Sequence, residues 1–290
     1  RGYYGRSVLA AFDFQNGEIT SRWVFDTENG KNPYSGQGNH GLSVADVDND
    51  GKDEIIFGAM TVDDDGTGLY TTGFRHGDAL HVSDLDPEIP GLEVFGVHEI
   101  EEHTTGPGVT LRKAIDGSVL FKAAPNRDIG RGVAANIDTT RIGAQMWWLG
   151  DRNLYDIKGH KMGSAPRETN FLIWWDGDAT RELLDGTHIT KYGKGMIFNA
   201  EGTRSNNWSK ATPSLSGDIL GDWREELVLP SKDNRELRVY STTIPTDIKL
   251  PTLMQDRQYR LSIAWQNVGY NQPPHPGFYL GTGWEKYYSE

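Results

Sequence analysis

Four acidic side chains stand close together in one short segment of the sequence. Asp46, Asp48, Asp50 and Glu54 occupy relative positions 1, 3, 5 and 9, and Gly51 allows the chain to turn back. Alternate carboxylates on a tight loop point to one side, where they repel one another unless a cation binds between them. An all-oxygen cage of this size favours Ca²⁺ over Mg²⁺. The segment therefore predicts a calcium site, and a solvated Asp-Gly turn is the alternative.

The same pattern returns three times further along the chain in a weaker form. Each copy retains acidic or amide side chains but loses at least one ligand, and the last copy has Leu220 at its third position. We expect calcium in these loops to be structural and not catalytic. The candidate ligands are Asp84, Asp86 and Glu93 in the first copy, Asn136 and Asp138 in the second, and Asp218, Asp222 and Glu226 in the third.

Four basic residues precede these acidic loops in an otherwise acidic chain. They are His40, His76, Arg131 and Lys210, one before each copy of the pattern. For any one of them, a packing or salt-bridge role is the simpler interpretation. Equivalent positions in repeated units of a propeller converge on one face, so four cations in register predict an anion-binding cleft.

Short runs rich in apolar and β-branched residues, separated by Gly, Asp and Asn, indicate an all-β fold with little helix. The acidic pattern recurs at intervals that fit one or two propeller blades of about 40–50 residues each. A β-propeller is therefore favoured over a sandwich. Asp-Gly pairs within residues 114–120 and 174–178 predict tight hairpin turns. The expected strands are residues 7–14, 19–25, 54–59, 79–83, 93–98, 120–122, 144–148, 170–175, 226–229 and 236–240.

Composition excludes several classes of protein and of site. The 290 residues contain no cysteine, which excludes disulfides and thiolate-bound zinc. The formal net charge of -12 argues against a nucleic-acid partner. No apolar run approaches the roughly 20 residues that span a membrane. The chain begins without Met or a signal peptide and directly beside strand-like sequence, so we expect it to be part of a longer protein.

Long stretches of the sequence resemble the rhamnogalacturonan lyases of polysaccharide lyase family 11. The resemblance covers essentially the whole chain and is carried by motifs that also contain the basic residues described above. These motifs are QGNHGLSVADVD at residues 37–48, RHGDALHVSDLDP at 75–87, DIGRG at 128–132, GDWREE at 221–226 and NVGYNQPPH at 267–275.

The resemblance implies calcium-assisted β-elimination in the pectic polysaccharide rhamnogalacturonan I. The bond between rhamnose and galacturonate is broken, and an unsaturated galacturonate is left at the new end. It also implies an eight-bladed propeller, of which residues 1–290 supply about the C-terminal half as part of a single domain. We therefore expect that activity needs the missing N-terminal half. Because the substrate is a plant cell-wall polymer, we expect a secreted enzyme.

This reaction suggests roles for the basic residues. A proton leaves C5 of a uronate that is already charged, so calcium or a basic group must hold the added charge. Lys210 is the first candidate for the base if neighbouring cations lower its pKa, and His40 and His76 follow as bases or uronate ligands. Arg131 suits a bidentate contact with a substrate carboxylate. The candidate sugar-binding residues are Asn206, Asn207, Thr212 and, by stacking, Trp208.

Two other functions use the same sequence features. A non-catalytic, calcium-stabilised carbohydrate-binding propeller requires the acidic loops but no base. A glycoside hydrolase requires two carboxylates that flank the scissile bond, and the acidic residues here are assigned to cation cages. We rank the hydrolase last.

Overall fold

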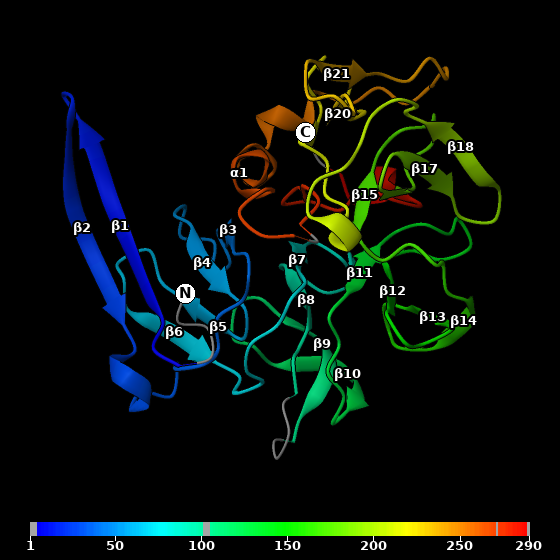
Figure 1. Cartoon of the computed structure of the whole chain (residues 1–290). Coiled ribbons are helices and arrows are strands. Elements are labelled where there is room, and N and C mark those ends of the chain that lie inside the picture. Colours follow the sequence, from blue (N-terminus) through cyan, green and yellow to red (C-terminus); the bar gives the residue numbers. More distant parts are fainter. Residues whose placement is uncertain (1–4, 101–104, 271, 289–290) are drawn as a thin grey trace.

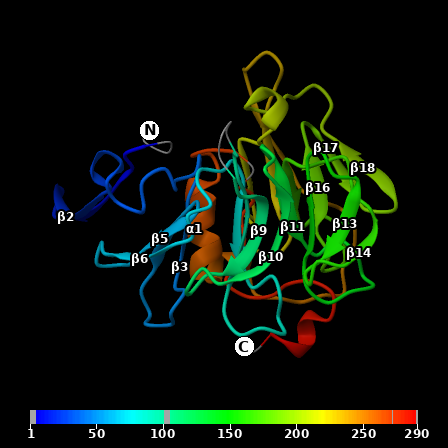
Figure 2. The same ribbon diagram turned by 90° about the horizontal axis from the view of Figure 1, so that it is seen from below.

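The computed structural model describes residues 5–100, 105–270 and 272–288. The chain begins with an antiparallel hairpin of β1 (Val8–Gln15) and β2 (Glu18–Asp26). Figures 1 and 2 show this hairpin standing apart from the other sheets. Several of its apolar side chains, including Phe12, Phe14 and Ile19, are exposed.

Five antiparallel sheets follow the hairpin along the described residues, and we call them blades 1 to 5 in chain order. Within each blade, every strand pairs with the next one along the chain, as in propellers. Blade 1 contains β3 (Ser43–Ala45), β4 (Glu54–Phe57), β5 (Met60–Val62) and β6 (Gly68–Thr71); blade 2 contains β7 (Leu80–Ser83), β8 (Glu93–Val97), β9 (Pro107–Lys113) and β10 (Val119–Pro125). Blade 3 contains β11 (Gly132–Ala135), β12 (Gln145–Trp148), β13 (Asn153–Asp156) and β14 (Lys161–Ser164). Blade 4 contains β15 (Phe171–Ile173), β16 (Glu182–Asp185), β17 (His188–Lys191) and β18 (Gly195–Asn199), and blade 5 contains β19 (Leu215–Gly217), β20 (Glu226–Pro230) and β21 (Leu237–Tyr240).

Adjacent blades pack face to face through buried apolar clusters. Successive side chains of a strand point to opposite faces of its sheet, so one strand can serve two interfaces. On β12, Trp148 packs with Phe95 of blade 2, whereas the preceding Trp147 packs with Leu172 of blade 4. Similar clusters join blade 1 to blade 2 and blade 4 to blade 5. The sheets therefore form a continuous series, which Figures 1 and 2 show as an arc.

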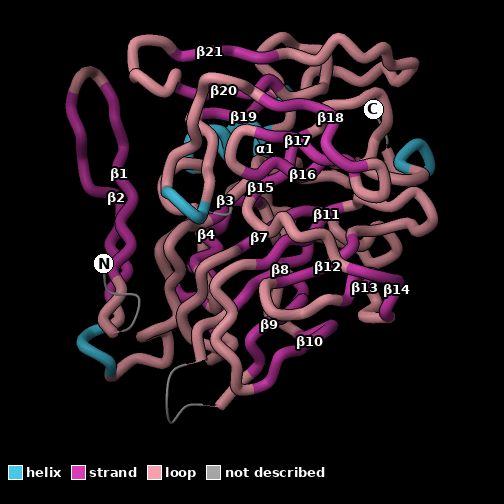
Figure 3. Tube along the Cα trace, turned by 45° about the vertical axis from the view of Figure 1, so that its right-hand side comes forward, coloured by secondary structure: helices cyan, strands magenta, loops and turns pink. Residues whose placement is uncertain are grey.

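Helices are short and few in the described part of the chain (Figure 3). The α-helix α1 (Arg257–Trp265) begins at Asp256, whose carboxylate accepts a hydrogen bond from the Tyr259 amide. It contacts both β3 and β19, the first strands of blades 1 and 5. None of the described helices has the length and apolar character needed to cross a membrane. The 3-10 helices are η1 (Glu28–Gly30), η2 (Trp208–Lys210), η3 (Leu253–Gln255) and η4 (Trp284–Lys286).

The structure confirms an all-β, propeller-like arrangement, and each of the ten predicted strands overlaps an observed one. The sequence pattern did not predict helix α1. The predicted tight turn at residues 174–178 is wrong, because residues 174–181 form a long loop between β15 and β16. The total of eight blades and the single-domain boundary at residues 1–290 stay predictions.

Candidate functional site

Two basic residues that are far apart in the sequence meet because the segments before blades 1 and 2 lie side by side. Asn39 and Gly77 form a parallel bridge between these segments, which places His40 next to His76. The bridge requires glycine, since a Cβ atom at Gly77 would lie 1.9 Å from the Val97 carbonyl oxygen. The two imidazole rings are 4.9 Å apart, centre to centre.

Asp78 lies within 4 Å of three of the four predicted basic residues, namely His40, His76 and Lys210. Its Oδ1 lies 3.1 Å from His40 Nε2 and accepts a hydrogen bond of 3.2 Å from the Tyr270 hydroxyl. Its Oδ2 accepts a hydrogen bond of 2.7 Å from Lys210 Nζ. Burial alone would raise the pKa of Asp78, but hydrogen bonds from His40 and Lys210 outweigh it and hold this pKa well below its usual range.

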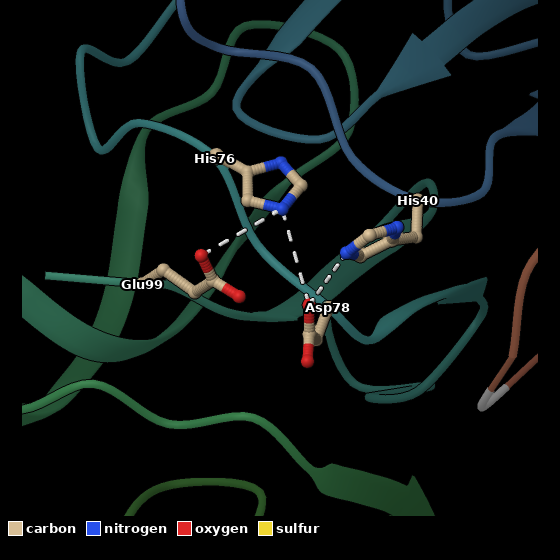
Figure 4. Close-up of side chains that lie close together, drawn as sticks. All are labelled: His40, His76, Asp78 and Glu99. Carbon is tan, nitrogen blue, oxygen red and sulfur yellow. Dashed lines mark ion pairs between the residues drawn. The ribbon is translucent and has the colours of Figure 1, made fainter. Parts of the chain in front are cut away.

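His40, His76, Asp78 and Glu99 offer a set of ligand atoms that lie within 4.8 Å of one another. Figure 4 shows their side chains pointing toward a common centre. His76 Nδ1 lies 2.7 Å from the Gly38 carbonyl oxygen, an arrangement that leaves Nε2 as a lone-pair ligand when Nδ1 carries the proton. This Nε2 is 3.9 Å from Asp78 and 4.0 Å from Glu99, too far for hydrogen bonds. The group fits a divalent cation.

Lys210 reaches Asp78 from the 3-10 helix η2. Its Nζ also donates a hydrogen bond of 2.6 Å to the Gly130 carbonyl and lies 4.3 Å from the centre of the Tyr270 ring. The nearest charged partner of Lys210 is therefore a carboxylate, and not the neighbouring cations that its predicted role as a base requires. Arg131 does not contact Asp78; its Nη2 donates to the hydroxyl of Ser209, the neighbour of Lys210. Its predicted contact with a substrate carboxylate stays a prediction.

The predicted sugar-binding residues differ in how accessible they are. Asn207 is exposed, and with His40 and Tyr270 it lines a cavity of about 740 Å³. Thr212 is fully buried, and its hydroxyl accepts a hydrogen bond of 2.7 Å from Asn207 Nδ2. Thr212 thus positions Asn207. Asn206 Nδ2 donates to the Ser214 hydroxyl at 3.3 Å.

All five blades place the same kind of residue at the start of their second strand. This residue is buried, and its side-chain oxygen accepts hydrogen bonds from backbone amides of the preceding loop. The shared contact fixes each loop against its sheet, and it explains why the pattern recurs in the sequence. The five residues are Glu54, Glu93, Gln145, Glu182 and Glu226.

In blades 1 and 2, two buried carboxylate oxygens of each loop have no hydrogen-bond partner in the structure. These atoms are Oδ1 of Asp46 and Oε1 of Glu54 in blade 1, and Oδ1 of Asp84 and Oε1 of Glu93 in blade 2. Burial raises the pKa of Glu54 to about 7 and that of Glu93 to about 8. Buried anionic oxygens without a partner are costly, and both loops fit a hard cation.

Blade 1 offers more acidic ligands than the sequence pattern predicted. One oxygen from each of Asp46, Asp48 and Asp50 lies within 4.8 Å of the others. Glu54, which the sequence pattern placed with these three residues, instead forms a second such group with Asp63 and Asp64, which lie between β5 and β6. One of the predicted ligands of blade 2 pairs with a lysine among the described residues. Asp86 Oδ2 lies 2.5 Å from Lys158 Nζ.

In blade 4 a lysine ammonium lies among the carboxylates. Lys191, at the end of β17, is buried, and its Nζ is 2.9 Å from Asp176, 2.8 Å from Asp178 and 2.6 Å from Glu182. These carboxylates raise the pKa of Lys191, although burial alone would lower it. Thr180 supplies a fourth oxygen at 2.7 Å. Blade 4 thus carries its own cation.

Blades 3 and 5 satisfy their loop residues with partners from within the chain. Asp222 pairs with the Arg224 guanidinium, whereas Asn136 and Asp218 have neutral partners. Asn136 Oδ1 accepts hydrogen bonds from the amide and the hydroxyl of Thr282. Asp218 Oδ2 accepts from the Thr252 hydroxyl and the Leu253 amide, at 2.7 Å each. Metal binding by the predicted ligands of these blades stays a prediction that the structure does not favour. The other predicted ligands in these two blades are Asp138, Asp222 and Glu226.

The sequence analysis did not identify several residues of the group around Asp78 and of the acidic loops. Asp78 stands two positions after His76, and this spacing in an extended segment could have indicated a shared side. An acidic loop in blade 4 was also recognisable from Asp176, Asp178 and Glu182. Glu99 and Lys191 gave no such local signal, because each reaches its partners through the folding of separate segments.

Comparison with known proteins places the chain in a family. A family model described as rhamnogalacturonan lyase family 11, C-terminal domain, matches residues 1–289. Rhamnogalacturonan endolyase YesW of Bacillus subtilis (strain 168) is 52% identical, with 98% of this chain and 46% of the relative covered. Rhamnogalacturonan exolyase YesX of the same organism is 50% identical, with 99% and 50% covered.

Solved structures agree with this assignment. The crystal structure of rhamnogalacturonan lyase YesW matches with a TM-score of 0.93 at 50% identity, covering 98% of this chain and 49% of that one. A Bacillus licheniformis rhamnogalacturonan lyase matches with the same TM-score at 53% identity, again covering 98% and 49%. The chain spans about half the length of the curated relatives it matches. It belongs to rhamnogalacturonan lyase family 11, in the region described by the family's C-terminal domain.

Proposed function

We propose that these residues form part of a polysaccharide lyase that cleaves the rhamnose–galacturonate bond of rhamnogalacturonan I by β-elimination. The observation that carries the proposal is the convergence of His40, His76 and Lys210 on Asp78 beside a cavity. The relatives named as rhamnogalacturonan lyases support the substrate class.

The described side chains suit the steps of this reaction. Lys210 is the proposed base: once its ammonium has lost a proton, its nitrogen takes the proton from C5 of galacturonate, the C4–O4 bond breaks, and a C4–C5 double bond forms. The ammonium formed can return this proton to the leaving oxygen. Asp78 and the Gly130 carbonyl orient the lysine. His40 and Tyr270 line the cavity and would face the uronate.

A divalent cation at His40, His76, Asp78 and Glu99 completes the proposal. When bound, this ion would neutralise the substrate carboxylate and so reduce the charge that develops as C5 is deprotonated. Calcium is the ion expected from the family resemblance, and the two imidazoles also suit Mn²⁺ or Zn²⁺. The carboxylates of blades 1 and 2 would bind calcium in a structural role.

The remaining expectations concern the whole protein. Because the relatives are about twice as long as this chain, we propose that further blades, eight in total, complete the ring and the substrate cleft. A polymer substrate that is too large to enter a cell uncut implies secretion. The non-catalytic carbohydrate-binding propeller is not favoured, because the relatives are named as lyases.

The test measures the ultraviolet absorbance of the unsaturated uronate during incubation of the full natural protein with rhamnogalacturonan. Lys210→Ala should lower turnover by about 10²–10⁴-fold, since general-base groups contribute that much. Lys194→Ala, at an exposed lysine of blade 4, is the matched control and should keep full activity. Near-normal turnover of Lys210→Ala would remove this residue from the mechanism.

The cation is tested separately, by removing metal with chelator and adding back Ca²⁺, Mn²⁺ or Zn²⁺. His76→Ala should lose activity that no added ion restores, while its unfolding transition in calcium stays close to that of the parent protein. If the chelated parent protein keeps full activity, the cation has no part in the reaction. A parent protein that binds rhamnogalacturonan without releasing an unsaturated product would support the binding propeller.

A further inference from the structure

Trp208 has an unusual combination of exposure and position. Its side chain is 96% exposed, more than any other large apolar side chain in the described ranges. Single exposed apolar residues are common on proteins and need no special cause. Trp208, however, directly follows Asn207, which lines the 740 Å³ cavity, and is the first residue of the turn η2 that ends at Lys210.

The backbone of Trp208 is strained. Its φ is +52°, in the left-handed region that is unfavourable for bulky residues, and glycine would avoid this cost. The flanking residues Asn207 and Ala211 also have positive φ values, of 56° and 46°. Strain of this kind persists where the surrounding structure enforces it, and it is concentrated at functional sites.

Contacts from three directions hold this turn in place. Asn170 Nδ2 donates a hydrogen bond of 3.0 Å to the carbonyl of Ser209, and Arg131 donates one of 2.7 Å to the Ser209 hydroxyl. On the other side, Asn207 Nδ2 donates to buried Thr212. The contacts that fix Lys210 therefore also fix the backbone from which the exposed indole projects, which limits the part of the turn that binding must order.

We infer that Trp208 is a sugar-binding platform at the mouth of the site, and that it stacks on a rhamnose ring next to the uronate held at Lys210. An aromatic ring offers a wide apolar face and no charge, so it suits a neutral deoxy sugar with a methyl group better than a uronate. In an alternating polymer, the neighbour of every galacturonate is rhamnose. This inference rests on the proposed function.

Trp208→Gly is the decisive variant because glycine accepts the local φ and should leave the turn and Lys210 in place. Burying one indole face is worth about a tenfold change in affinity. We expect Trp208→Gly to lower kcat/KM for rhamnogalacturonan about tenfold, mainly through a higher KM. Trp208→Phe should recover most of the loss, because it restores a ring. Leu237→Ala, at an exposed apolar residue of β21, should match the parent protein.

Fluorescence separates this inference from the proposed function. Rhamnogalacturonan should change the tryptophan emission of the parent protein, and Trp208→Gly should abolish most of that change, whether or not any product forms. Polygalacturonate, which lacks rhamnose, should give a much smaller change. A KM for Trp208→Gly within twofold of the parent value, or a loss confined to kcat, would overturn the inference.

Discussion

Blades 2 and 4 build the same acidic loop and neutralise it differently. In both, a buried glutamate at the start of the second strand accepts hydrogen bonds from two loop amides. In blade 4 the Lys191 ammonium then contacts three carboxylates, whereas in blade 2 Asp84 and Glu93 each retain a buried oxygen without a hydrogen-bond partner. The same loop therefore contains an internal cation in blade 4, and we propose that the loop of blade 2 binds a cation from solution.

The largest expected decrease in the free energy of unfolding follows from removing Lys191, the internal cation of blade 4. Lys191→Met leaves Asp176, Asp178 and Glu182 facing one another without a counter-charge. Breaking a buried ion pair in this way costs about 3–5 kcal/mol. We expect this decrease in the free energy of unfolding, measured by urea denaturation in chelator, and we expect calcium to restore a large part of it.

Lys194→Met is the control for this experiment, because Lys194 is exposed in the turn between β17 and β18. Its unfolding should match the parent protein with and without calcium. If Lys191→Met is as stable as the parent protein in chelator, the ammonium of Lys191 does not act as the internal cation, and the contrast with blade 2 fails.

Glu93→Gln converts the blade 2 loop into the neutral form that blade 3 already uses. Gln145 holds the same two loop amides with an amide oxygen, so the backbone contacts should survive. In chelator above pH 8, where Glu93 is ionised, the variant should be about 2 kcal/mol more stable, because a buried charge without a partner is removed. In calcium it should be less stable by a similar amount, since a ligand is lost. The same sign of change under both conditions would refute a cation site in blade 2.

The pH dependence of the chelated protein follows from the same carboxylates. Burial raises the pKa of Glu93 to about 8 and that of Glu54 to about 7, so the folded state binds more protons than the unfolded state between about pH 4.5 and 8. Stability should therefore fall by about 1–2 kcal/mol as pH rises through this window. Calcium should remove this slope. Thermal unfolding at pH 5 and pH 8, with and without calcium, provides the measurement.

Ten of the strands β1 to β21 were predictable from the sequence because their signals are local. Consecutive apolar residues such as Trp147 and Trp148 mark a strand with two buried faces, and the recurring acidic pattern marks the loop after each first strand. The contacts between blades were not predictable in this way. Lys210 and Asp78 are 132 residues apart in the sequence, and only the packing of successive blades against one another brings Lys210 Nζ to 2.7 Å from Asp78 Oδ2.

The smallest effect concerns blade 5, where Asp218 has neutral partners. Thr252→Val removes one hydrogen bond to Asp218 Oδ2 but leaves the bonds from the Leu253 and Gly221 amides. The loss should therefore be only about 1 kcal/mol in the free energy of unfolding. It should also be the same in calcium and in chelator, because Asp218 is satisfied within the chain. A loss of stability that calcium reverses would show that Asp218 binds a cation, as the sequence pattern predicted. The loop of blade 5 would then bind a cation from solution, as we propose for the loop of blade 2.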